Sequence, residues 1–281
     1  MGLMQSSCAV VALAGLAAAG HAEIKVTVEN VNGAGGFFFT PFWVALHNGE
    51  FDSYDGGTLA SMWPGLTELA EAGDTGPISE AFHASPAGKA GGVDSTILAV
   101  AFATDAPVLN PGERATFTME TGDRTVNRWF GYASMVIPSN DLFVANGNPL
   151  AHEIFAANGT FNGPVVIEIT GGASNDNGTE VNDAFGGAAF SANGGEGADE
   201  KVEIRNFFTE DGDSKYLASF IGTETVTGFE ITDPFGPDDV IVRITIEQTA
   251  SATCPADVDG DDDVDFDDLL QILDGWGPCP G

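Results

Sequence analysis

The chain has 281 residues, a length that allows one large domain or two ordinary ones, and 43% of its residues are apolar, enough for a substantial core. Asp and Glu total 42 against 9 Lys and Arg, which gives a net charge of −33. Such a charge repels nucleic acid and anionic membranes, so it excludes nucleic-acid-binding functions. It suits divalent cations and salty surroundings, although solubility alone also explains much of it.

Residues 1–22 predict a secretory signal peptide. An apolar run over 8–17 is too short to cross a membrane, and Gly20-His21-Ala22 provides a small-x-small cleavage site. The segment before this run lacks Lys and Arg, which is atypical of such signals. We therefore expect an exported protein, extracellular or periplasmic, without a membrane span.

The mature chain is expected to be mainly β. Ile24, Val26 and Val28 alternate with polar residues, as in a half-buried strand, and an aromatic strand is expected over 37–46. Helical patterns follow at 59–74 and 78–84, and then a Gly/Ala/Pro loop at 85–93. Further strands are expected over 96–103, 114–121, 129–137, 165–170, 201–208 and 240–247.

Seven or eight strands separated by Gly, Pro and Asp turns predict an antiparallel β-sandwich over 23–248, with short inserted helices. Residues 171–200 are rich in Gly, Asn and Asp and are expected to form one long loop. A polar linker at 249–253 separates the sandwich from an acidic module at 254–281.

Carboxylates stand in turns beside two hydrophobic runs of the predicted sandwich. Asp141 follows the apolar run 135–137, which breaks at Pro138, and Asp176 and Glu180 lie four residues apart around a glycine. Hard cations such as Ca²⁺ take six to eight oxygen ligands, which loops at strand ends can supply together. The three carboxylates are therefore candidate calcium ligands. Asn, Asp and Gly also dominate ordinary turns, so a purely structural role remains open.

The two segments that contain these carboxylates carry a family resemblance. Met135–Val144 and Asp176–Asn182 resemble the "I/V-P-S/T-x-D-x-F-V" and "D-A-G-T-D/E" stretches of the spondin N-terminal domain family. Thr40–Asp52 and Leu66–Asp74 are similar to the start of bacterial members, so the resemblance covers roughly residues 24–250. The sequence departs from the family at Asn177, where Ala is usual, and lacks the cysteines that surround vertebrate domains.

The resemblance implies a sandwich similar to a C2 domain, with one Ca²⁺ held by Asp141, Asp176 and Glu180. Members of the family bind matrix, microbial surfaces or receptors. It therefore implies a secreted, calcium-binding adhesion or ligand-binding protein whose partner is an extracellular protein or glycan.

The acidic module has the spacing of an EF-hand loop followed by one helix. Leu269, Ile272, Leu273 and Trp276 have the spacing of the buried stripe of a helix, which an acidic disordered tail, the alternative, would not predict. At loop position 7 the ligand is the main-chain carbonyl of the residue. Loop positions 1, 3, 5, 7, 9 and 12 are occupied by Asp257, Asp259, Asp261, Asp263, Asp265 and Asp268.

The module departs from an EF-hand in two ways, since Asp262 replaces the glycine of position 6 and no helix precedes the loop. It resembles a single dockerin repeat, whereas dockerins that bind cohesin usually carry two. The resemblance implies an attachment or sorting tail with a cell-surface or cohesin-like partner and a second Ca²⁺. Cys254 and Cys279 flank the module, and in an exported protein we expect them to form a disulfide.

The sequence contains no recognisable catalytic motif, so a non-enzymatic protein is expected. His47, His83 and His152 show no metal-ligand spacing, and neither a nucleophile elbow nor a nucleotide-binding loop occurs. A calcium-dependent glycan-binding accessory protein is the alternative, and it would need exposed aromatic side chains near the metal. A hydrolase that uses two carboxylates is a third possibility. The aromatic candidates are Phe143, Phe185 and Phe190.

Overall fold

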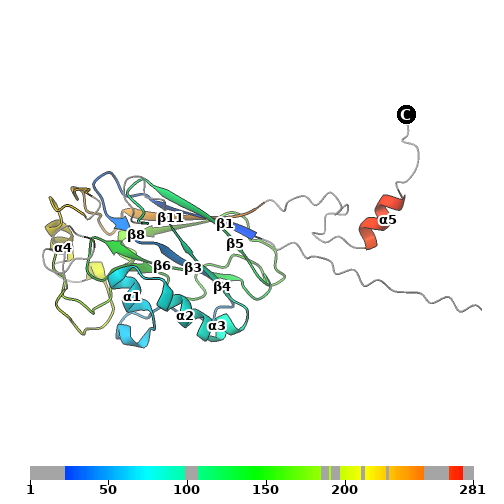
Figure 1. Ribbon diagram of the computed structural model, residues 1–281, viewed down its shortest axis with the longest axis horizontal. Helices are drawn as coiled ribbons and strands as arrows, with labels where there is room; N and C mark the ends of the chain where they lie inside the picture. The colour runs from blue at the N-terminus through cyan, green and yellow to red at the C-terminus, as the bar shows by residue number, and fades with distance from the viewer. Residues whose placement is uncertain are drawn as a thin grey trace, which may run out of the picture. The chain divides into compact units, whose positions relative to one another are not determined.

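The structure is a computed structural model that describes residues 23–98, 107–184, 190, 197–209, 213–225, 228–249 and 266–274 (Figure 1). The described residues up to Thr249 belong to one compact unit, and those of 266–274 belong to another. The prediction of a mainly β, antiparallel sandwich with short helices is confirmed by two packed antiparallel sheets. Within these ranges, no helix has the length and apolar character that crossing a membrane requires.

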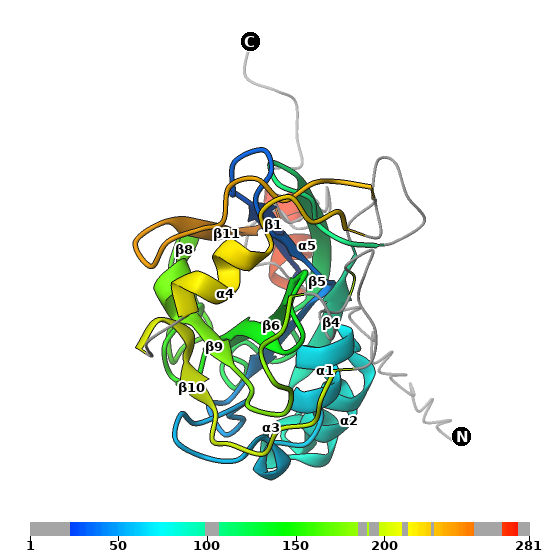
Figure 2. The same cartoon turned by 90° about the vertical axis from the view of Figure 1, so that its left-hand side faces the viewer.

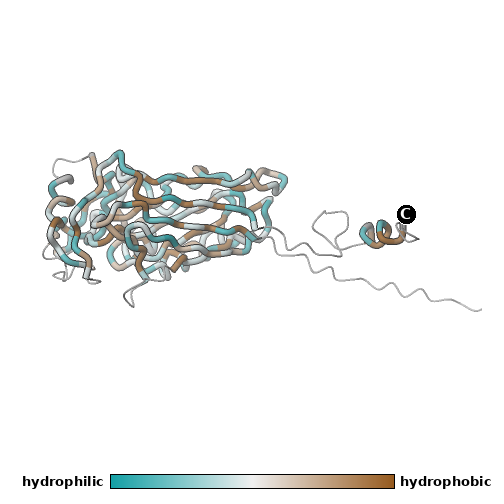
Figure 3. The backbone as a smooth tube through the Cα atoms, turned by 90° about the horizontal axis from the view of Figure 1, so that it is seen from above, coloured by the Kyte–Doolittle hydropathy of each residue, from teal (hydrophilic) through white to brown (hydrophobic). Residues whose placement is uncertain are grey.

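The smaller sheet has four antiparallel strands in the order β5-β1-β11-β8. In β1 the side chains of Ile24, Val26 and Val28 are fully buried between the sheets, whereas the intervening polar side chains lie on the outer face. Along the strands, Figure 3 shows the resulting alternation of hydrophobic and hydrophilic residues. The strands are β1 (Glu23–Asn30), β5 (Arg114–Glu120), β8 (Val165–Thr170) and β11 (Val240–Gln248).

The larger sheet has the order β10-β9-β7-β6-β3-β4, with β2 paired to β6. All six residues of β3 are buried because both faces of this sheet are covered. Phe42, Val44 and Leu46 belong to the core between the sheets, and Trp43 and Ala45 belong to a second core on the other face. The strands are β2 (Phe38–Phe39), β3 (Phe42–His47), β4 (Val93–Ile97), β6 (Trp129–Ile137), β7 (Leu142–Ala145), β9 (Ser174–Asp176) and β10 (Arg205–Asn206).

Short helices cover the outer face of the larger sheet and form a third layer (Figures 1 and 2). Phe82 is fully buried in this layer, with its ring centroid 5.7 Å from that of Trp43 and 5.1 Å from that of Phe51. The helices of the layer are η1 (Ala60–Met62), α1 (Leu66–Ala72), α2 (Gly76–Ala84) and α3 (Pro86–Lys89). The other helices are η2 (Gly171–Ala173), η3 (Phe207–Thr209), α4 (Asp213–Ser219) and α5 (Phe266–Asp274).

Several predicted elements differ in the structure. The aromatic strand expected over 37–46 is divided at Thr40-Pro41 into β2 and β3. The expected loops at 85–93 and 171–200 contain α3 and β9, respectively. Of the strand expected over 201–208, only β10 forms, and η3 follows it directly. β7 and α4 were not predicted, since each is too short to show a clear periodicity.

His47 ends β3 inside the protein, and we expect it to destabilise the fold in acid. Its Nδ1 accepts a hydrogen bond from the N–H of Gly49 at 3.0 Å, and burial lowers the pKa of His47 from 6.5 to about 4. Below pH 6.5 the unfolded chain takes up a proton that the folded protein does not, so the free energy of unfolding falls by up to about 3 kcal/mol as the pH approaches 4.

Chemical denaturation between pH 7 and pH 4.5 tests this expectation by comparing the protein with its His47→Gln variant. The difference in unfolding free energy between the two proteins should shrink as the pH falls. A difference that stays constant over this range would contradict the assigned role of His47.

Candidate metal centre

The turn between β6 and β7 places Asp141 inside the protein. Ser139 fixes this turn, because its Oγ accepts a hydrogen bond from the N–H of Leu142 at 3.1 Å. The N–H of Asn140 donates to the hydroxyl of Tyr216 in α4 at 3.3 Å, and that hydroxyl donates to Asn140 Oδ1. The side chain of Asp141 is fully buried as a result.

Asp176 lies beside Asp141 because β9 pairs with β7, in a register that places Asp176 opposite Leu142. Asp176 is 1% exposed. The chain then turns at Gly178, which has a φ of +68° and donates its N–H to Asp176 Oδ1 at 2.8 Å. A Cβ at Gly178 would lie 2.7 Å from the carbonyl oxygen of Val202, so the tight turn requires glycine.

The loop after Gly178 wraps around the carboxylate of Asp141. The N–H groups of Thr179 and Glu180 donate to Asp141 Oδ2 at 2.9 and 3.1 Å. Even so, burial and the neighbouring negative charge of Asp176 raise the pKa of Asp141 to about 8. Two buried carboxylates next to each other favour an added proton or cation.

Three buried side-chain oxygens in the β6–β7 turn and in the segment after β9 make no hydrogen bond with the described residues: Asp141 Oδ1, Asn177 Oδ1 and Asn182 Oδ1. The Nδ2 groups of the two asparagines are engaged, since Asn177 donates to Thr179 Oγ1 at 3.0 Å and Asn182 to Asp176 Oδ2 at 2.7 Å. Buried acceptors without donors are costly, and carboxylate and amide oxygens are ligands that Ca²⁺ takes. The residues present therefore fit a hard cation.

Glu180 is the third predicted ligand, and its main-chain N–H and its carboxylate contact two different neighbours. Its main-chain N–H donates to Asp141, whereas its carboxylate accepts a hydrogen bond from the N–H of Gly197. Burial, together with the charges of Glu71 and Asp199, raises the pKa of Glu180. In the described part of the chain, no three His, Cys, Asp or Glu side chains gather as a metal-binding group. A cation here would need amide oxygens in addition to the carboxylates of Asp141 and Asp176.

Arg205 already supplies one positive charge to this centre. It lies opposite Asp176 in the β9–β10 pairing, and its Nη2 and Nε are 2.9 and 3.2 Å from Asp176 Oδ2. Sequence reasoning missed both Arg205 and Tyr216. The one available signal was the rarity of basic residues, because Arg205 is one of only 9 in the chain.

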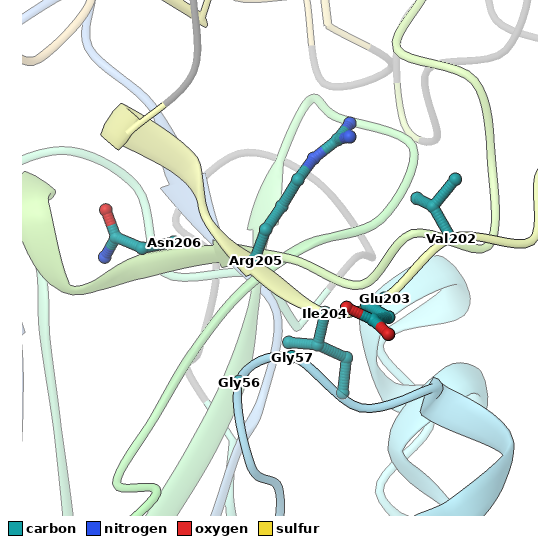
Figure 4. Close-up of a pocket in the computed structure, with 7 residues that line it drawn as sticks. All are labelled: Gly56, Gly57, Val202, Glu203, Ile204, Arg205 and Asn206. Atoms are coloured by element: carbon teal, nitrogen blue, oxygen red, sulfur yellow. The ribbon is translucent and has the colours of Figure 1, made fainter.

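A cavity of about 620 Å³ borders this centre, formed by 202–206 and the Gly56-Gly57 loop (Figure 4). Two hydrogen bonds hold the loop to Ile204. The N–H of Gly57 donates to the carbonyl oxygen of Ile204 at 2.8 Å, and the N–H of Ile204 donates to the carbonyl oxygen of Thr58 at 2.7 Å. Figure 4 shows the Arg205 side chain directed away from the glycine loop. The cavity and the candidate metal centre thus share Arg205, which lines the cavity and bonds to Asp176.

The described aromatic candidates for glycan binding are not exposed side chains beside the metal centre. Phe143 is fully buried, with its ring centroid 5.1 Å from that of Tyr54, and Phe190 packs against the core between the sheets. Phe185 lies outside the described residues. No exposed aromatic from this set adjoins the candidate metal centre in the described part of the chain.

Most of the predicted EF-hand falls outside the described residues, namely Asp257, Asp259, Asp261, Asp263 and Asp265, together with Cys254, Cys279 and Trp276. The predicted helix is present as α5, and Asp268 within it is 2% exposed. The expected burial of Leu269, Ile272 and Leu273 is not seen, since these side chains are 44–51% exposed. α5 is the one described element of its unit, so no other described element of that unit offers them a packing surface.

A comparison with known protein families and a comparison with curated proteins each found no match to this chain.

Proposed function

We propose that this is a secreted, calcium-binding adhesion or ligand-binding protein with a spondin-type sandwich domain. The observation that supports it most directly is the set of buried oxygens without donors, on Asp141, Asn177 and Asn182, beside the carboxylate of Asp176. A hard cation satisfies such oxygens and offsets the charges of two buried carboxylates. The Asp141 and Asp176 segments are also the two that resemble the spondin family.

In this proposal, Asp141, Asp176 and the amide oxygens of Asn177 and Asn182 hold the cation. Bound Ca²⁺ supplies positive charge and ties the β6–β7 turn to the loop after β9. Arg205 is then the neighbouring positive charge and shares Asp176 with the ion. The cavity beside 202–206 would receive part of an extracellular protein or glycan ligand.

Two measurements test this function. Isothermal titration calorimetry should detect one Ca²⁺ per Ala22–Thr249 unit. Binding of the protein to immobilised matrix proteins and to a glycan array, with and without Ca²⁺, then separates adhesion from the glycan-binding alternative. The absence of Ca²⁺ binding by this unit would overturn the metal centre. Turnover of a polysaccharide would instead favour a hydrolase.

The tail is proposed to be a dockerin-like attachment or sorting module with its own Ca²⁺. A peptide of residues 254–281 is below about 40 residues, so it should need its metal or its disulfide to fold. We expect the reduced, metal-free peptide to be unfolded and to gain helix on addition of Ca²⁺, as circular dichroism would show.

Variants of the peptide distinguish aspartates that would bind Ca²⁺ through their side chains from an aspartate whose side chain is not needed. Asp257→Ala or Asp268→Ala should remove the gain in helix, because positions 1 and 12 of the loop ligate through side chains. Asp263→Ala is the matched control and should retain most of it, because position 7 ligates through its carbonyl. A peptide that ignores Ca²⁺ at about millimolar concentration would show that the tail is not an EF-hand.

A further inference from the structure

A second cavity, of about 440 Å³, lies between the chain after β3 and helices η1 and α2. Phe51, Met62, Trp63 and Ile78 form its apolar wall, and the acidic residues Glu50 and Asp52 also line it. None of these six residues belongs to the candidate metal centre. The cavity therefore has an apolar wall and acidic residues, and the proposed function leaves it unused.

Among the described residues, no cationic side chain pairs with the carboxylate of Asp52. None of the ion pairs among the described residues involves Asp52 or Glu50. Asp52 Oδ1 is buried and makes no hydrogen bond with the described residues, although the carboxylate accepts main-chain hydrogen bonds from Tyr54 and Ser53. Burial, with a smaller contribution from the charge of Asp55, raises the pKa of Asp52 to about 6. A positively charged group would favour the ionised carboxylate.

The aromatic side of the cavity is held in place before any ligand arrives. The indole N–H of Trp63 donates to Thr58 Oγ1 at 2.8 Å, which fixes the ring. Phe51 packs against Phe82 and Trp43, with ring centroids 5.1 and 5.4 Å apart. Aromatic faces attract organic cations and also bury aliphatic stems, so this wall suits a ligand that has both features.

We propose that this cavity binds a guanidinium or primary ammonium group carried on a short apolar stem. The head group pairs with Asp52 and Glu50, and the stem packs against Phe51 and Trp63. The net charge of −33 attracts such cations and repels anions. Metal binding is a poorer match, because only two carboxylates, those of Glu50 and Asp52, line this cavity beside its apolar wall. The head group can belong to a free small molecule or to an Arg or Lys side chain of a protein.

The first test uses the full-length protein and two probes of the same shape. Butylguanidinium carries the charge, and butylurea is its neutral counterpart. Titration calorimetry at low salt should show that butylguanidinium binds at least about tenfold more tightly, which corresponds to one charge-assisted hydrogen-bonded pair. Equal affinity of the two probes, or no binding of either, would overturn the proposal.

The second test places the site on Asp52. Asp52→Asn retains the shape of the side chain and should reduce the affinity for butylguanidinium by about tenfold, while the weak affinity for butylurea stays unchanged. Glu80→Gln is the matched control, because Glu80 is an exposed acid of α2 that does not line the cavity. The same loss in both variants would mean that only the net charge matters and would refute a defined site.

A third comparison identifies the source of the head group. A Gly-Gly-Arg-Gly-Gly amide peptide is titrated beside its counterpart with citrulline, the neutral isostere of arginine. Tighter binding of the arginine peptide than of butylguanidinium supports a protein side chain as the ligand, and the reverse order supports a free small cation. The proposal fails if all three probes, the arginine peptide, the citrulline peptide and butylguanidinium, bind with the same affinity, because the positive charge is then irrelevant to binding.

Discussion

Calcium should raise the melting temperature of the Ala22–Thr249 unit, and Asp141→Asn should remove most of this rise. An ion that binds only the folded state at a hundredfold excess over its dissociation constant stabilises by about 2.7 kcal/mol. For a unit of this size, that corresponds to roughly 5–10 °C. In EDTA at pH 8, the variant should be at least as stable as the unsubstituted protein, because burial and Asp176 disfavour the ionised form of Asp141.

Differential scanning calorimetry in EDTA and in Ca²⁺ measures both effects. Asp238→Asn is the control, since it removes one negative charge from an exposed side chain that is not among the candidate ligands and should leave the response to Ca²⁺ unchanged. Identical melting of the unsubstituted protein in the two buffers would refute the calcium centre. So would a full calcium response in the Asp141→Asn variant.

Loss of Arg205 should be costly without Ca²⁺ and milder with it. Arg205→Gln leaves Asp176, which is 1% exposed, without its positive partner. Breaking a fully buried pair lowers the free energy of unfolding by about 3–5 kcal/mol, and the loss here should lie at the lower end of this range because Arg205 is 28% exposed. Bound Ca²⁺ supplies positive charge to the same carboxylate, so the deficit of the variant should shrink in its presence.

Urea denaturation in EDTA and in Ca²⁺ checks this result against Arg243→Gln. Arg243 pairs with Glu168 and Glu29 on the outer face of the smaller sheet, where the partners are 37–50% exposed, so its loss should cost much less than the loss of Arg205. A loss for Arg205→Gln no larger than that for Arg243→Gln would contradict the assigned role. A deficit that is the same in both buffers would show that the ion does not share Asp176.

Most strands with clear periodicity could be predicted from the sequence almost residue by residue. The exception is the strand predicted over 96–103, since β4 spans Val93–Ile97 and 99–103 lie outside the described residues. β6 and β8 have the predicted bounds, and β1, β5 and β11 lie within a residue or two of theirs. These segments alternate, or run apolar throughout, over six or more residues. β7, β9 and β10 have four residues or fewer, so tertiary pairing decides them and local pattern does not.

The candidate metal centre was predictable only in part. The segments that carry Asp141 and Asp176 could be recognised in the sequence, because turn residues stand there beside apolar runs. The structure brings these two side chains together. Arg205 and Tyr216 could not be assigned, because their contacts depend on pairing between segments far apart in the chain. The direction of the Glu180 carboxylate depends on the pairing of its loop with 197–200, which no local signal reveals.

The strand order also determines how the sandwich would carry mechanical load. β1 and β11 are neighbours, and the N–H of Thr249 donates to the carbonyl oxygen of Glu23 at 3.2 Å, so the chain enters and leaves the sandwich at one end. The candidate metal centre is at the opposite end. Asn30, the last residue of β1, donates its Nδ2 to the carbonyl oxygen of Phe37 at 2.9 Å, and Phe38 pairs with Ile137 at the end of β6 that leads to Asp141.

A pull between a partner held near Asp141 and an anchor beyond Thr249 therefore runs along the strands. The hydrogen bonds that join β11 to β1 and β8 lie across this direction. They would be loaded together in shear and would have to break at the same time, which resists force better than opening them one after another. An adhesion protein attached through its C-terminal side would gain tensile strength from this arrangement without any further contact.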